Sequence, residues 1–261
     1  MKTVAKKHTT VGNVKIIKDF SMPQLKTKRR IWIYLPPDYE TSSKRYPVLY
    51  MHDGQNVFDD FTACAGAWDV DKTMERLFKS RKTPGAIIVG IDNAGKNRMR
   101  EYNPWAEIGG KGDKYSDFIV DTLKPYIDKN FRTKKSRENT GIMGSSMGAY
   151  ISLYIALKHP QIFSRVGLLS PAFWLYHDNL KEMLEGVTVI EPVKFYFSVG
   201  TEEGDEERTK QYIDWTKFTY EVLSKKMTNK KRIKLNIIKG GIHSETVWAK
   251  VFSPAFLWLF K

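Results

Sequence analysis

Short apolar runs recur along the chain, each bounded by charged or turn-forming residues. Continuous runs of this kind are typical of strands that are buried on both faces of a parallel sheet. They occupy residues 31–35, 48–52, 86–91, 141–143, 166–169, 195–199 and 235–238. An earlier strand near residues 14–19 is expected to pair antiparallel with residues 29–35.

Longer segments with a helical period separate the later runs. They lie at residues 70–79, 115–130, 147–158, 206–226 and 245–260. In the second of them, Phe118, Leu123 and Ile127 fall on one apolar stripe, with charged residues on the opposite side. Such a stripe predicts a helix face that packs on the core and holds no cofactor.

The alternation of strands and helices predicts a single domain over residues 1–261. Its centre is expected to be a doubly wound, mostly parallel sheet of about eight strands with helices on both faces. The segment 170–192, between two predicted strands, is the longest stretch available for a small cap. No repeat or low-complexity linker indicates a second domain.

The composition supports a folded domain. Of 261 residues, 41% are hydrophobic and 13% aromatic, which is enough for a sizeable core and unlike a disordered chain. Cys64 is the sole cysteine, so the chain has no intramolecular disulfide and too few ligands for a cysteine-based metal site. No apolar stretch reaches the roughly 18 residues that span a bilayer. Residues 1–20 are too interrupted for a secretion signal, so we expect a cytoplasmic protein without membrane contact.

The formal charge of +14, from 43 Lys+Arg against 29 Asp+Glu, raises the question of a nucleic-acid partner. Clustered cations favour such a partner because they displace counterions from phosphates. The densest basic runs are short and fall at expected turns or helix ends, at residues 26–30, 79–82, 134–137 and 225–234. We expect these runs to be solvated and no nucleic acid to bind.

A Gly-x-Ser-x-Gly motif, residues 144–148, lies directly between a predicted strand and a predicted helix. The motif alone is common by chance, but this position is typical of a nucleophile elbow, a turn so tight that only glycine fits two residues either side of the serine. The hydroxyl of Ser146 is then expected to stand exposed at the carboxyl ends of the strands, where open α/β sheets bind ligands. Ser145 lies outside the motif and is expected to pack.

A serine becomes nucleophilic when a histidine removes its proton and a carboxylate orients that histidine. In chains with this elbow the order is Ser, acid, His. His243 fits the order, because it lies in a Gly-rich loop between the last predicted strand and the terminal helix. His159 is expected to cap the helix that follows the elbow, and His177 to be a cap or a surface residue.

The acid is expected just after the strand at 195–199, where several carboxylates follow Gly200. Most of them suit the acidic first turn of the next helix. We favour Glu203 as the acid, with Asp205 second and Glu202 third. A Ser–His dyad without a functional acid also stays open.

The oxyanion of a tetrahedral intermediate needs two backbone N–H donors. Met147, which follows the nucleophile, is expected to supply one, and the amide of Gln55, in the loop after the strand at 48–52, the other. His52, Asp53 and Asp59 are expected to organise this loop. We expect no metal site here, because no further ligands recur at a recognisable spacing.

Loops at the strand ends are expected to form the walls of a substrate pocket. Their aromatic content suits an apolar acyl group or the face of a sugar, and Arg98 or Arg100 would suit an anionic substrate. Loop packing explains each of these residues at least as well. The pocket candidates are His52, Asp53, Gly54, Arg100, Tyr102, Phe173, Trp174 and Trp248.

Four segments together resemble a known family: YMHDGQNVFD at 50–59, ENTGIMGSSMG at 138–148, LSPAFW at 169–174 and GGIHSETVW at 240–248. They are similar to the esterase family of α/β-hydrolases that includes feruloyl and acetyl-xylan esterases, enterochelin-esterase-like enzymes, S-formylglutathione hydrolases and mycolyltransferases. The resemblance implies an α/β-hydrolase fold with a minimal cap. It also implies a nucleophile at Ser146, a base at His243, an acid at Glu203 and oxyanion amides at Gln55 and Met147. The histidine loop looks most like the enterochelin-esterase-like branch.

These observations predict a serine carboxylic ester hydrolase that needs no cofactor. Its substrate is expected to be a small-molecule ester with a small or aromatic acyl group, of a sugar or a siderophore among other alcohols. The protein is expected to be a monomer or a homodimer. Two alternatives stay open: an acyltransferase with the same triad, and a hydrolase fold that only binds anionic partners.

Overall fold

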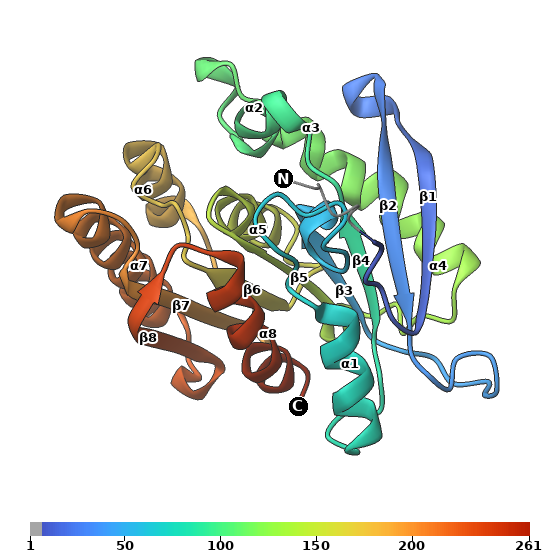
Figure 1. Cartoon of the computed structure of the whole chain (residues 1–261). Helices are drawn as coiled ribbons and strands as arrows, with labels where there is room; N and C mark the ends of the chain where they lie inside the picture. Colours follow the sequence, from blue (N-terminus) through green and yellow to red (C-terminus); the bar gives the residue numbers. More distant parts are fainter. Residues whose placement is uncertain (1–6) are drawn as a thin grey trace, which may run out of the picture.

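The computed structural model describes residues 7–261, which form one eight-stranded sheet in the order β1-β2-β4-β3-β5-β6-β7-β8 (Figure 1). The strands are β1 Asn13–Met22, β2 Thr27–Leu35, β3 Val48–His52, β4 Ile87–Ile91, β5 Thr140–Ser145, β6 Arg165–Leu169, β7 Lys194–Glu202 and β8 Ile233–Ile242. β1 pairs antiparallel with β2, and β2 with β4, whereas the remaining pairs are parallel. The predicted fold class and strands are confirmed.

Helices cover both faces of the sheet, as the alternation predicted (Figure 1). One apolar core includes buried residues of α3, α5, α6 and α7, and a second includes those of α1 and α8. Neighbouring residues of β2 alternate between these two cores: Ile31 and Ile33 lie in the first, and Trp32 in the second. This alternation follows from the two-residue period of a strand and explains why buried strands read as continuous apolar runs. The helices are α1 Val70–Lys79, α2 Arg98–Tyr102, α3 Gly112–Asp117, α4 Lys124–Asn130, α5 Met147–Lys158, α6 His177–Gly186, α7 Glu206–Lys226 and α8 Glu245–Phe260.

The helix predicted at 115–130 is interrupted in its hydrogen-bond register. A π-helical segment, Phe118–Leu123, separates α3 from α4. Pro125 stands in the first turn of α4 and has no N–H to donate to the preceding turn. The register therefore changes just before it, while the predicted apolar stripe still packs on the core.

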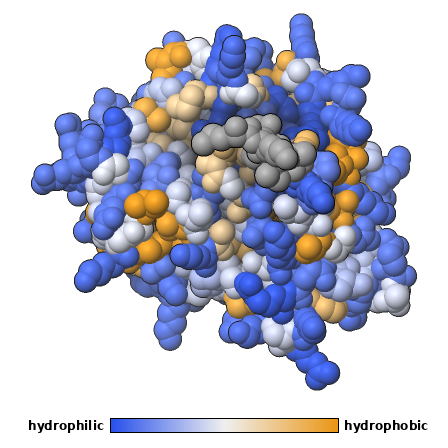
Figure 2. Space-filling model, in the orientation of Figure 1, coloured by the Kyte–Doolittle hydropathy of each residue, from blue (hydrophilic) through white to orange (hydrophobic). Residues whose placement is uncertain are grey.

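The short helices α2 and α6 were not predicted. α2 has only five residues, and α6 buries only Leu180 and Leu184. α6 lies within the segment 170–192 that was expected to provide a small cap. None of the helices among residues 7–261 is both long and apolar enough to cross a membrane. The face of the molecule seen in Figure 2 is largely hydrophilic, with small separate hydrophobic patches.

The carboxyl ends of β7 and β8 approach each other very closely. A Cβ atom placed on Gly200 would overlap the backbone carbonyl of Gly241 in the neighbouring strand. The loops that follow these two positions contain Glu203 and His243. The close contact of two glycines therefore determines how these loops meet.

We predict that Gly200→Ala destabilises the protein by about 1–3 kcal/mol, because the added methyl group must push β7 and β8 apart. Gly186→Ala is the matched control, since a Cβ atom at Gly186 in α6 meets nothing within 4 Å. Urea unfolding of both variants provides the measurement. A stable Gly200→Ala variant would show that the two strands separate without cost.

Candidate active site

Ser146 lies at the sharp turn between β5 and α5. Its backbone adopts φ 55° and ψ −125°, a strained conformation for a residue with a side chain. Its N–H donates to the carbonyl of Leu169 at 3.0 Å, which holds the turn against β6. A Cβ atom on Gly144 would lie 2.5 Å from the carbonyl carbon of Gly148, so both glycines of the motif are required by the tight turn. The side chain of Ser146 is partly exposed, as predicted for an elbow.

Glu203 and His243 meet beside this turn. The Nδ1 of His243 lies 2.7 Å from Oε2 of Glu203, whose side chain has no exposed surface. The other carboxylate oxygen, Oε1, accepts hydrogen bonds from Ser170 Oγ and from the backbone N–H of Gly200, each at 2.6 Å. A carboxylate oxygen accepts in such a contact, so Nδ1 is the donor nitrogen and Nε2 is the ring nitrogen that takes no part in it.

The other acid candidates have different positions. Asp205 is the N-cap of α7, where its side chain accepts a hydrogen bond from the N–H of Arg208 at 2.8 Å. Glu202 ends β7 and is exposed. Of the acid candidates, therefore, Glu203 is the one in hydrogen-bond contact with His243.

Aromatic rings fix the position of His243. The rings of Tyr212 and Trp248 each lie 4.9 Å from its imidazole, measured between centroids. Trp248 also donates from Nε1 to Ser170 Oγ at 3.0 Å. Trp248 thus supports the acid and the histidine, and only 5% of its surface is exposed. Ser170, from the LSPAFW segment, was not predicted as a site residue although its position after a strand was a signal.

The loop after β3 is anchored by residues from β4 and α2. Asp53 takes a left-handed conformation with φ 55°, and its N–H donates to the hydroxyl of Tyr102 at 3.1 Å. Arg98 forms a double hydrogen bond to the carboxylate of Asp53, at 2.6 and 2.9 Å. A Cβ atom on Gly54 would lie 2.7 Å from the β4 backbone, so this residue packs tightly on the sheet.

The backbone of Gln55 follows directly in this loop, within the short 3-10 turn Gly54–Asn56. Its side chain is buried, and Oε1 accepts a hydrogen bond from the N–H of Asn93 at 3.1 Å. Met147 is the first residue of α5, where backbone N–H groups have no partner within the helix. Asp59 accepts hydrogen bonds from His8 and from the Thr9 N–H, and so organises the end of the loop as expected.

Several pocket candidates are placed elsewhere by the structure. Tyr102 and Phe173 have no exposed surface and belong to the core, so they line no open pocket. His52 is buried at the end of β3, with Nδ1 2.9 Å from the hydroxyl of Tyr115. Arg100 lines a different cavity, together with residues of β2. Apolar or aromatic character at a loop did not distinguish a pocket wall from a residue that packs the loop down.

The pocket candidate Trp174 is partly exposed and lies close to the elbow. Two residues that the sequence did not single out, Tyr212 and Arg208, pack against it. Its ring contacts that of Tyr212 at 5.9 Å, and the guanidinium carbon of Arg208 lies 3.5 Å from its centroid. Burial raises the pKa of the Tyr212 hydroxyl, and the neighbouring Trp174 and Ser146 partly oppose this shift. Tyr212 and Arg208 come from the first half of α7, where the sequence shows only an amphipathic helix.

No cluster of three or more His, Cys, Asp or Glu side chains suitable for a metal ion occurs among residues 7–261. A serine that is activated by a histidine, itself oriented by a carboxylate, can attack a carbonyl carbon and form an acyl intermediate.

Comparison with known proteins gives the family. A family model described as "Putative esterase" matches residues 22–259. The chain belongs to this esterase family. The resemblance noted in the sequence is therefore confirmed at the level of the family.

Similar proteins match most of the length of this chain. The protein named "Uncharacterized protein YbbA" from Bacillus subtilis (strain 168) is 29% identical over 245 residues, which are 89% of this chain and 92% of YbbA. The enterobactin esterase FES from Shigella flexneri has a similar structure, with a TM-score of 0.77 at 22% identity over 97% of this chain. The aligned part is 60% of the FES chain. A ferulic acid esterase matches with a TM-score of 0.72 at 19% identity, over 95% of this chain and 99% of that one.

We predict that the buried His52 destabilises the esterase in acid. Burial lowers its pKa from 6.5 to about 3, with the cation of Arg98 as a smaller cause. In the unfolded chain His52 therefore binds a proton near pH 6.5, whereas in the folded protein it stays neutral down to about pH 3. The contribution of the neutral His52 to stability is complete above pH 6.5 and is lost as the pH falls. From this group the free energy of unfolding should fall by about 2 kcal/mol between pH 7 and pH 5.

Urea unfolding at the two pH values, for the wild type and for His52→Gln, measures this effect. Glutamine retains a hydrogen-bonding partner for Tyr115 and does not titrate. The variant should show a smaller loss of stability between pH 7 and pH 5, whatever its stability at pH 7. An equal loss in both proteins would contradict the assignment to His52.

Proposed function

We propose that the protein is a serine carboxylic ester hydrolase in which Ser146 is the nucleophile, His243 the general base and Glu203 the orienting acid. The observation that carries this proposal is the 2.7 Å contact between His243 Nδ1 and a fully buried carboxylate of Glu203, beside a strained serine turn. Membership of the esterase family supports it.

The reaction would proceed through an acyl-enzyme. Ser146 Oγ attacks the ester carbonyl carbon while Nε2 of His243 takes the hydroxyl proton. The tetrahedral intermediate collapses, the C–O bond to the alcohol breaks, and the alcohol leaves with the proton from Nε2. A water molecule, deprotonated by His243, then attacks the acyl carbon and releases the acid. Glu203 remains ionised and stabilises the imidazolium.

The oxyanion would be held by the backbone N–H groups of Met147 and Gln55. Met147 begins α5, so its N–H points from a helix N-terminus, where partial positive charge favours an anion. Gln55 lies in a loop that is fixed by Arg98, Tyr102 and the β4 backbone. A fixed loop suits this role, because donors that are already oriented cost nothing to reorganise during the reaction.

The substrate is proposed to be an ester of a small or aromatic acid. The partly exposed ring of Trp174 packs on Tyr212, which lies beside Ser146, and Arg208 stacks on Trp174. Such a wall suits an aromatic ring or the face of a sugar. Two structurally similar proteins are named as an enterobactin esterase and a ferulic acid esterase, which is consistent with this class.

We predict that Ser146→Ala and His243→Ala each lower kcat on p-nitrophenyl esters by at least about a thousandfold. Glu203→Gln should lower it by roughly a hundredfold or more, because the histidine loses its orienting carboxylate. Asp205→Asn and Glu202→Gln are the matched controls and should stay within a few-fold of the wild type. Asparagine preserves the N-cap of α7.

A fluorophosphonate probe, located by peptide mass spectrometry, tests the nucleophile directly. Labelling of Ser146 that disappears in His243→Ala is the expected result. Absence of labelling in the wild type would refute the triad and favour a hydrolase fold that only binds. If the protein transfers the acyl group to an added alcohol faster than it hydrolyses the ester, it is instead an acyltransferase.

We predict that Tyr212→Phe and Tyr212→Leu differ in their kinetics. Phenylalanine keeps the ring against His243 and loses only the hydroxyl beside Ser146, so kcat should fall by less than about tenfold. Leucine also removes the aromatic contact, and kcat should fall further as the imidazole gains freedom. Equal kcat values for the wild type and Tyr212→Leu would show that the ring does not position His243.

A further inference from the structure

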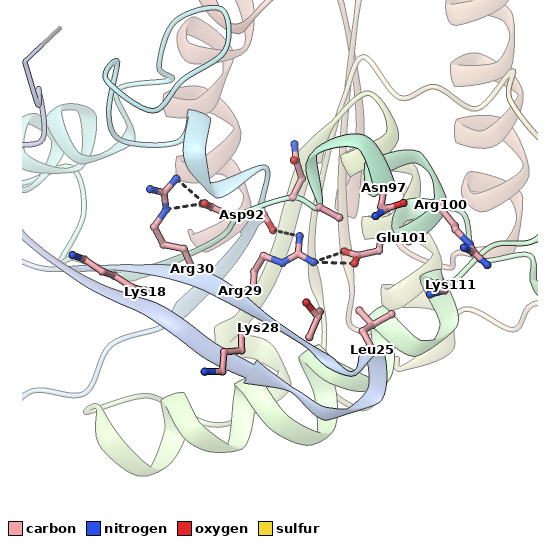
Figure 3. A pocket seen from close by; sticks show the side chains of 13 residues that line it. Lys18, Leu25, Lys28, Arg29, Arg30, Asp92, Asn97, Arg100, Glu101 and Lys111 are labelled. Carbon is pink, nitrogen blue, oxygen red and sulfur yellow. Dashed lines mark hydrogen bonds and ion pairs between the residues drawn. The ribbon is translucent and has the colours of Figure 1, made fainter. Parts of the chain in front are cut away.

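A cavity opens at the side of the sheet where β2 pairs with β4 (Figure 3). None of the proposed triad residues lines it. Its volume is about 440 Å³, within the range of small-molecule sites. The walls are the start of β2, the loop after β4, α2 and Lys111. The cavity lies at the end of β4, and Ser146 lies at the end of β5. Strand β3 separates these two strands in the sheet.

Two ion pairs occupy the floor of this cavity. Arg29 binds both carboxylate oxygens of Glu101 at 2.9 Å, and the two side chains are almost fully buried. Arg30 pairs with Asp92 at 2.7 Å (Figure 3). Each carboxylate of the lining therefore already has its own arginine, and neither is left to neutralise another cation.

The remaining cations of the lining have no carboxylate partner within residues 7–261. Arg100 donates from Nε only to the backbone carbonyl of Gly109, at 3.0 Å, so its terminal nitrogens remain available. These cations come from β1, β2, α2 and the segment before α3, and they surround one hollow rather than follow one helix face. They are Lys18, Lys28, Arg100 and Lys111.

The buried Arg29 lies beneath these cations and is already bound by Glu101, so it is part of the floor and does not reach an incoming ligand. Lys18, Lys28 and Arg100 are exposed and carry like charges around one hollow. An anion with several acceptor oxygens would relieve their mutual repulsion.

We propose that this basic cavity is a binding site for the phosphate group of a phosphorylated small molecule. Phosphate offers two negative charges and oxygens that suit arginine and lysine donors. The lining is polar, with Asn97 and Thr27 beside the cations, which fits an oxyanion better than an apolar ligand. A hollow of this volume fits a small molecule, whereas a nucleic acid requires an extended basic surface.

Isothermal titration calorimetry tests the site with inorganic phosphate, pyrophosphate and glycerol 3-phosphate, each at the same ionic strength. We expect saturable binding of one equivalent. The double variant Lys28→Ala/Arg100→Ala should weaken it by about tenfold or more, since two charge-assisted contacts are lost. Lys225→Ala is the control: this exposed lysine lies in the last turn of α7 and lines no part of the cavity. Thermal unfolding shows that each variant is folded.

The outcomes separate the possible sources of the phosphate. Tighter binding of glycerol 3-phosphate than of inorganic phosphate identifies an organic phosphate ester, and the reverse identifies the free ion; both support the site. Absence of saturable binding at millimolar concentrations, equal weakening by Lys225→Ala, or equal binding of citrate at matched ionic strength would overturn the proposal. Repeating the titration with Ser146→Ala separates this cavity from the proposed triad, because binding there should be unchanged.

Discussion

The carboxylate of Glu203 is the interaction on which the geometry of the candidate active site depends. It accepts hydrogen bonds from His243 in the loop after β8, from Ser170 in the loop after β6, and from the backbone of Gly200 near the end of β7. A buried carboxylate is tolerated when its oxygens are satisfied in this way. The acid therefore orients the histidine and also joins three strand ends. Trp248, through Ser170, extends the same network to α8.

The sequence predicted the sheet and the main helices because both follow from hydrophobic period. It also placed Ser146, Glu203 and His243 at strand ends, where chain order and the glycine motif are strong signals. It did not predict Ser170, Tyr212 or Arg208, whose roles depend on contacts between distant segments. The pocket candidates Tyr102 and Phe173 are buried instead, because an aromatic residue in a loop looks the same in sequence whether it faces solvent or core.

The basic residues are scattered along the sequence, but the fold gathers a few of them at one place. The basic residues of β1 and β2 look solvated when each is considered alone, and most basic side chains elsewhere on the chain fit that view. Only the folded sheet brings Lys18, Lys28 and Arg100 around one hollow. The expectations of a cytoplasmic location and of a monomer or homodimer remain predictions of the sequence.

The segment between β6 and β7 has a consequence for how the fold can diversify. Its start is fixed by Ser170, whose N–H donates to Ser198, and its end by Lys194, whose N–H donates to Ser164. The intervening α6 buries only Leu180 and Leu184. Insertions or exchanges in this segment would thus remodel the neighbourhood of Trp174 without displacing the strands. It is the natural position for grafting new substrate preferences onto this scaffold.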